Sequence, residues 1–143
     1  MTREDMMTME DANLFVAVGD ALEKKFAQEN ELTGPQINVY TLYLFDLEVQ
    51  NGGLNQFFQN SSGEFAPFIP SALLSVEADE YEALLAHFLD ETDLDLENLE
   101  DCDNEKYNAA YVEFDDRYYA LYETQPLDEM VAAYIRAHAD MFC

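Results

Sequence analysis

Apolar residues recur every three or four positions along most of the chain, a spacing typical of helices that bury one face. The first stripe, within residues 10–29, consists of Leu14, Phe15, Val18, Leu22 and Phe26. Three later stripes repeat the spacing: Tyr81, Leu84, Leu85 and Phe88; Tyr107, Tyr111, Phe114, Tyr118 and Leu121; and Leu127, Met130, Val131, Tyr134 and Ile135. We predict a helix for each stripe, with Asp79 and Glu82 forming a capping box and Pro126 opening the last helix.

Residues 34–50 differ from these stripes because they are apolar nearly all round. Thr33 and Gln36 stand at the two positions of a capping box, so we expect a helix to begin here. All-round apolarity favours a central, buried helix. The run from Ile37 to Phe45 would also suit a buried strand, which remains the alternative for this segment.

Glycine and proline mark the ends of the shorter elements. Asn51-Gly52-Gly53 is typical of a helix C-cap. A short helix is predicted for Leu54–Gln59, ended by Asn60–Gly63, and Pro67 or Pro70 suits the first turn of the next helix.

The chain shows no hairpin signal, internal repeat or linker. We therefore expect an all-α fold in which residues 1–143 form one compact domain of seven or eight helices.

The composition is strongly acidic, because 31 Asp and Glu face only six Lys and Arg, for a net charge of -25. Ten Phe and nine Tyr distinguish the chain from a disordered acidic tail, which is poor in aromatic residues. Such a charge repels nucleic acid and anionic membranes and attracts basic surfaces. We expect a basic protein partner, with no direct nucleic-acid or membrane binding.

Several features favour a cytoplasmic location. Residues 1–7 lack the basic and then apolar pattern of a secretory signal, and no run of about 18 apolar residues exists. Cys102 and Cys143 fit neither a disulfide framework nor a metal-site spacing, so we interpret them as free thiols.

The negative charge is unevenly distributed. Residues 26–105 contain eighteen Asp and Glu but no Lys or Arg. Four leucines, at positions 89, 94, 96 and 99, interleave with the densest part and predict that it is anchored to the core. The candidate partner-binding surface consists of Asp90, Glu91, Asp93, Asp95, Glu97, Glu100, Asp101, Asp103 and Glu105, with Glu77, Asp79, Glu80 and Glu82 as a second row and Asp115 and Asp116 as additions.

The amount of charge is comparable with that of DNA. A compact domain of this length has a diameter of roughly 37 Å, and B-DNA carries about 22 charges over that distance. Imitation of a duplex's electrostatic profile is therefore physically reachable. The alternative explanation is solubility or adaptation to high salt.

No arrangement of residues predicts catalysis, a cofactor or a specific metal site. A calcium-loop interpretation of the segment from Asp93 fails at Asn98 and Asn104, where Gly and Glu are required. His87 is interpreted as a packed or boundary residue rather than a catalyst. The tyrosines of residues 107–122 are interpreted as core or dimer-interface residues, because the charge opposes base stacking.

The string from Asn51 to Gly63, preceded by Glu48, is uncharged and unusually specific: Asn51, Gly52, Gly53, Leu54, Asn55, Gln56, Phe57, Phe58, Gln59, Asn60, Ser61, Ser62 and Gly63. The structural interpretation is a sharp helix exit at the glycines, packed phenylalanines, and capping of the next helix by Asn60, Ser61 and Ser62. The functional interpretation is a polar pocket in which Asn51, Gln56 and Asn60 bind a ligand.

This string resembles the signature of a bacterial family of small all-helical proteins, one member of which is an acidic DNA mimic. Leu54 stands where an aromatic residue is common. The resemblance implies a homodimer whose acidic surface imitates duplex DNA and keeps a DNA-binding protein, such as a helix-turn-helix transcriptional regulator, off its operator. The alternative function is a non-catalytic binding module that uses residues 51–63 for another partner or a small ligand.

Overall fold

The computed structural model describes the backbone of residues 1–143 and every side chain except those of Ser61 and Ser62. Over this backbone the chain forms eight α-helices and three 3-10 helices, and the only β feature is an isolated bridge between Asp95 and Asn98. The elements are α1 (Arg3–Thr8), α2 (Asp11–Glu29), α3 (Gly34–Gly52), α4 (Leu54–Gln59), η1 (Ser61–Phe68), α5 (Ile69–Ser75), α6 (Asp79–Thr92), η2 (Glu105–Tyr107), α7 (Asn108–Thr124), α8 (Leu127–Ala137) and η3 (Ala139–Met141). The prediction of a single all-α domain is confirmed.

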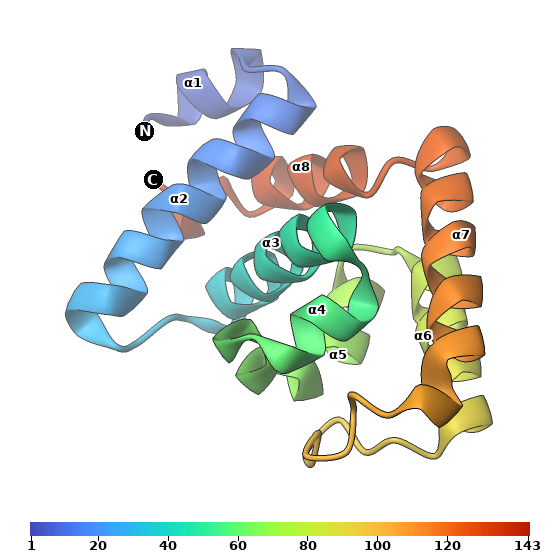
Figure 1. The fold of residues 1–143 in the computed structure, drawn as a ribbon. Helices are drawn as coiled ribbons and strands as arrows, with labels where there is room; N and C mark the ends of the chain where they lie inside the picture. Colours follow the sequence, from blue (N-terminus) through green and yellow to red (C-terminus); the bar gives the residue numbers. More distant parts are fainter.

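The helix α3 lies at the centre of the molecule (Figure 1) and contacts α2, α4, α5, α8 and η1. Because neighbours surround it, apolar residues are buried on several of its sides, among them Val39, Leu42 and Phe45. The predicted capping box of Thr33 and Gln36 is present. The strand alternative for this segment is wrong, because all-round apolarity here reflects burial by helices on several sides.

Gly53 ends α3 as predicted, with a φ of 93° that side-chain-bearing residues rarely adopt. A Cβ atom at this position would lie 2.3 Å from Oδ2 of Asp115. The predicted short helix follows directly as α4. Glycine is therefore required here both for the backbone turn and for the close approach of α7.

Two predicted caps are wrong. The residue before α6 is Ala78, and Asp79 is the first helical residue, without a side-chain cap. The turn from α5 explains this result: the Ala78 amide donates to the Leu73 carbonyl and the Glu77 amide to that of Leu74, a Schellman motif with Glu77 in the left-handed conformation. No extended residue is left to cap α6.

Asn60 does not cap the following helix either, because its side chain makes no capping hydrogen bond. The chain continues directly into η1, which the sequence pattern did not predict. The predicted capping by Ser61 and Ser62 concerns side chains outside the described residues. Helix α1 was also missed, since it is too short to carry an apolar stripe; a capping box between Thr2 and Asp5 was its one signal.

Helices α6 and α7 form an antiparallel hairpin along one edge of the molecule (Figure 1). At one end, the Tyr81 hydroxyl donates to the Gln125 carbonyl over 2.7 Å. Toward the other end, the rings of Phe88 and Tyr111 lie 4.9 Å apart. A loop joins the helices at that end, and the buried aromatic residues of both connect to the core around α3.

The opposite side of the fold is formed by α1, α2 and α8 (Figure 1). Arg136 of α8 donates to the Met6 and Met9 carbonyls and pairs with Asp11 at 2.6 Å. This one side chain therefore fixes the N-terminal helices to α8. None of the described helices combines the length and apolarity of a membrane span.

Candidate interaction surface

Residues 79–124 comprise α6, the connecting loop, η2 and α7. We call this unit the acidic hairpin. It contains sixteen of the 31 carboxylates but only two basic residues, Lys106 and Arg117. About a third of the chain therefore carries a net charge of -14 out of -25. The uneven charge distribution along the sequence thus corresponds to one structural unit at the edge of the molecule (Figure 1).

The loop of the acidic hairpin is held against the core by its apolar residues. Leu94, Leu96 and Leu99 are partly buried and packed on the core cluster, and Cys102 is buried within it. The Tyr111 hydroxyl donates to the Cys102 carbonyl over 2.7 Å. The predicted anchoring of this acidic segment is confirmed.

Local hydrogen bonds shape the loop further. Oδ1 of Asp95 accepts from the Glu97 amide at 2.9 Å, and the Asn98 amide donates to the Asp95 carbonyl over the same distance. The Asn55 side chain of α4 donates to Asp103 at 3.1 Å. Backbone turns and one long-range contact therefore hold the carboxylates of the loop in defined positions.

Most of the predicted surface residues are exposed, but they do not form two parallel rows. Glu77, Asp79 and Glu80 lie at the N-terminal end of α6, whereas Asp90 lies in its last turn and the loop follows its C-terminal end. The fourteen residues of α6 span about 20 Å. The two groups therefore occupy opposite ends of the acidic hairpin.

Two predicted surface residues, Glu82 and Asp115, are only half exposed. Oδ1 of Asp115 accepts a hydrogen bond from the Leu54 amide at 3.0 Å, so this carboxylate caps the start of α4. Burial raises the pKa of Asp115, although the hydrogen bond acts in the opposite direction. This geometry gives Asp115 a structural role.

The string of residues 51–63 is also built around a carboxylate. Oε2 of Glu48 accepts from the side-chain amides of Gln56 and Asn60, at 2.8 and 2.6 Å. Phe57 and Phe58 are buried, as predicted. Since two of the three amides expected to bind a ligand already pair with Glu48, the geometry favours the structural interpretation of this string.

Sequence reasoning missed the buried carboxylate of Asp46 on α3. It accepts hydrogen bonds from the hydroxyls of Tyr118 and Tyr122 on α7 and from the Gln50 side chain. Burial raises the pKa of Asp46, and these three hydrogen bonds partly oppose that effect. Burial also raises the pKa of Tyr118 far above its ordinary value. This polar cluster joins the acidic hairpin to the centre of the fold.

His87 lies at the boundary of the apolar face, the second of the two predicted positions, and not packed in the core. Its side chain is 45% exposed and faces carboxylates from both helices of the acidic hairpin. The i,i+4 spacing of His87 and Glu91 was visible in the sequence, but the third member, Glu113, comes from a different helix.

The chain matches the model of a known protein family. The family model described as DMP19-like protein matches residues 30–138, well over half of the chain. The chain belongs to the DMP19-like protein family. No curated protein and no solved structure matches the chain.

The DMP19-like match spans α3 to α8, and therefore the whole acidic hairpin and residues 51–63. The DMP19 family is one of DNA-mimic proteins. The resemblance seen in the sequence is therefore confirmed at the level of the family.

Proposed function

We propose that this DMP19-like protein is a DNA mimic that binds a DNA-binding protein through the acidic hairpin and blocks that protein's access to DNA. The observation that carries the proposal is the concentration of exposed carboxylates on one ordered structural unit. Acidity that served only solubility would have no reason to gather on one edge of the fold.

The charge of the acidic hairpin is on the scale of a duplex of the same length. Helix α7 has 17 residues and is therefore about 25 Å long. B-DNA carries about 15 phosphate charges over 25 Å, and the acidic hairpin has a net charge of -14. A basic surface that recognises DNA by its charge would meet a similar field here.

A helix-turn-helix transcriptional regulator is the partner that fits best, because its DNA-contacting surface is basic and of similar width. Such regulators bind as dimers to half-sites about 34 Å apart. A homodimer of this protein would present two acidic hairpins related by a two-fold axis. The proposal therefore includes homodimerisation, which light scattering coupled to size-exclusion chromatography tests directly.

The central experiment is a competition between the protein and DNA. A helix-turn-helix regulator captured from the host on the immobilised protein at about 100 mM salt is purified and bound to its labelled operator. Added protein should release the operator in a mobility-shift assay, and its affinity should fall at least about tenfold between 50 and 200 mM salt. Capture without release of the operator would contradict mimicry.

Two sets of charge-neutralising substitutions locate the interaction. The first set lies on the acidic hairpin and comprises Asp90→Asn, Glu97→Gln, Glu100→Gln and Glu105→Gln. The control set removes the same charge from α1, α2 and the turn after it: Glu4→Gln, Glu23→Gln, Glu29→Gln and Glu31→Gln. All eight residues are exposed.

The hairpin set should weaken competition at least about fourfold, since each of the four lost contacts with a basic group contributes about 0.2–1 kcal/mol. The control set should change it by no more than about twofold. Equal effects of both sets would indicate an unspecific charge effect. Loss of binding on substitution of Asn51, with the hairpin set neutral, would instead favour a binding module centred on residues 51–63.

A further inference from the structure

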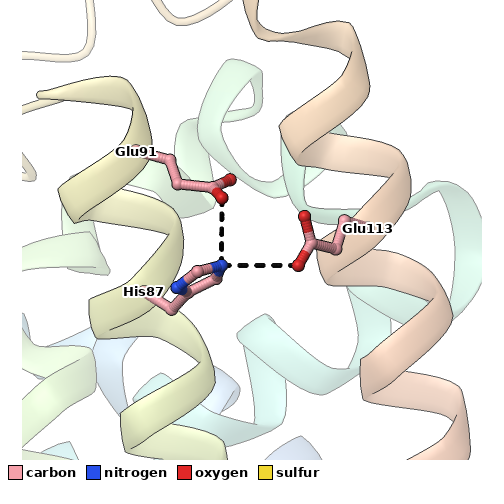
Figure 2. A group of neighbouring side chains, drawn as sticks. All are labelled: His87, Glu91 and Glu113. Carbon is pink, nitrogen blue, oxygen red and sulfur yellow. Dashed lines mark ion pairs between the residues drawn. The ribbon is translucent and has the colours of Figure 1, made fainter.

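Figure 2 shows three side chains that converge between α6 and α7. Nε2 of His87 lies 3.1 Å from Oε1 of Glu91, one turn further along α6, and 3.3 Å from Oε1 of Glu113 on α7. The three candidate ligand atoms all lie within 4.8 Å of one another. The side chains are 41–45% exposed, so the site is accessible from solvent.

Hydrogen bonding accounts for only one of the two contacts that Nε2 of His87 makes. A ring nitrogen carries at most one proton, so Nε2 of His87 can donate a good hydrogen bond to only one of the two carboxylates. Two negative groups and one nitrogen lone pair directed at the same point are better matched by a doubly charged cation.

The spacing also fits a metal ion. Around zinc with bonds of about 2.0–2.1 Å, neighbouring tetrahedral ligands lie about 3.3–3.4 Å apart. The two distances from Nε2, 3.1 and 3.3 Å, are close to that value before any ion is bound. The two carboxylate oxygens lie within 4.8 Å of each other, so they would have to approach by at most about 1.5 Å to accommodate the ion.

The surroundings support the same assignment. Beneath the three side chains, Leu84, Phe88 and Phe114 leave a space too small for a water molecule, so the site has a dry apolar floor. Beside it, an open groove of about 480 Å³ between α6 and α7 gives access to His87. Nη1 of Arg117 contacts the same oxygen, Oε1 of Glu113, at 3.2 Å, so this guanidinium would have to turn to the other carboxylate oxygen when Oε1 binds a metal.

We propose that His87, Glu91 and Glu113 form a zinc-type divalent metal site that links α6 to α7, with a fourth position open to water on the groove side. One nitrogen and two carboxylate oxygens suit zinc and its first-row neighbours, whereas calcium prefers six to eight oxygens. The sequence alone did not predict this site, because the three ligands come from two helices and no short His or Cys motif marks them.

Zinc titration in competition with a chromophoric chelator tests the site on the intact protein. One zinc ion should bind per chain, and His87→Gln and Glu113→Gln should each weaken binding at least about tenfold. His138→Gln and Glu123→Gln are the matched controls, since they make the same chemical changes at exposed positions outside the cluster. They should bind zinc like the wild type.

Two further measurements make the outcome decisive. Zinc should raise the melting temperature of the wild type and both controls but not of His87→Gln, whose fold is checked by circular dichroism without metal. Bound cobalt should give the intense visible absorption of tetrahedral coordination in the wild type and both controls but not in His87→Gln. Equal zinc affinity in His87→Gln, or several equivalent sites per chain, would overturn the proposal.

Discussion

The loop of the acidic hairpin and the seam where α7 meets α3 and α4 use carboxylates in opposite ways. In the loop of the hairpin, the carboxylates of Glu97 and Glu100 are exposed. In the seam, Asp46 and Asp115 are buried or half-buried, and each accepts hydrogen bonds that join α7 to other elements. A carboxylate on the loop is available to a partner, whereas a carboxylate in the seam stabilises the fold.

This difference shows that net charge alone does not identify functional residues. The exposed carboxylates contribute little to stability because water solvates them. The few in the seam matter more, because a buried polar group that loses its partner is costly. Substitutions in the two regions should therefore separate stability from binding.

The largest effect is expected for Gly53→Ala in the seam. The substitution forces a side-chain-bearing residue into a positive φ and displaces Asp115 from the amide it caps. We expect the free energy of unfolding to fall by about 2–3 kcal/mol, measured by urea denaturation. Gly34→Ala is the control, since its Cβ meets nothing within 4 Å; it should be neutral or slightly stabilising.

Tyr118→Phe should have the next largest effect. It removes a hydroxyl that donates to the buried Asp46, and we expect a loss of about 1–3 kcal/mol in the free energy of unfolding. Tyr119→Phe removes a hydroxyl that donates to the Val49 carbonyl, but Tyr119 is 42% exposed. The free energy of unfolding should therefore fall by only about 0.5–1 kcal/mol. Equal losses would mean that burial does not distinguish the two hydroxyls.

The seam also predicts the pH dependence of stability. The pKa values of Asp46 and Asp115 are raised in the folded state, so folding takes up protons, and stability is lost as pH rises through the folded pKa values. The urea midpoint should therefore rise as the pH is lowered from neutrality toward the ordinary carboxyl pKa of about 4. Asp46→Asn should make that increase smaller. If the urea midpoint of this variant depended on pH as in the wild type, the raised pKa of Asp46 would be contradicted.

The smallest effect on stability is expected for the four hairpin substitutions that should impair binding most. Removing four exposed charges relieves repulsion without breaking buried contacts, so the free energy of unfolding should change by less than about 0.5 kcal/mol and in the stabilising direction. A clear destabilisation would mean that the loop carboxylates support the fold and would weaken the contrast between the two regions.

Local pattern predicted the helices well, because periodicity and caps depend on residues close in sequence. Two features predicted in this way are the capping box of Thr33 and Gln36 and the packing of the loop leucines against the core. The cap at Asp79 failed because the preceding turn, with Glu77 in a left-handed conformation, depends on how α5 ends.

The polar contacts could not be predicted in the same way. The two tyrosine partners of Asp46 lie more than 70 residues away in sequence, and Leu54 and Asp115 are 61 positions apart. The apolar pattern of residues 34–50 places Asp46 on a buried helix but does not indicate which groups it pairs with. Sequence reasoning therefore placed Asp115 on the surface and missed the convergence of His87 and Glu113.

The leucine anchors of the acidic loop have a consequence for the entropy of binding. A disordered acidic segment would lose about 1–2 kcal/mol per residue in backbone entropy when a partner fixes it. With Leu94, Leu96 and Leu99 packed on the core, the fold has already met that cost before any encounter. Truncating one of these leucines would loosen the loop and weaken association while every charge stayed in place, so residues that never touch a partner would help to set its affinity.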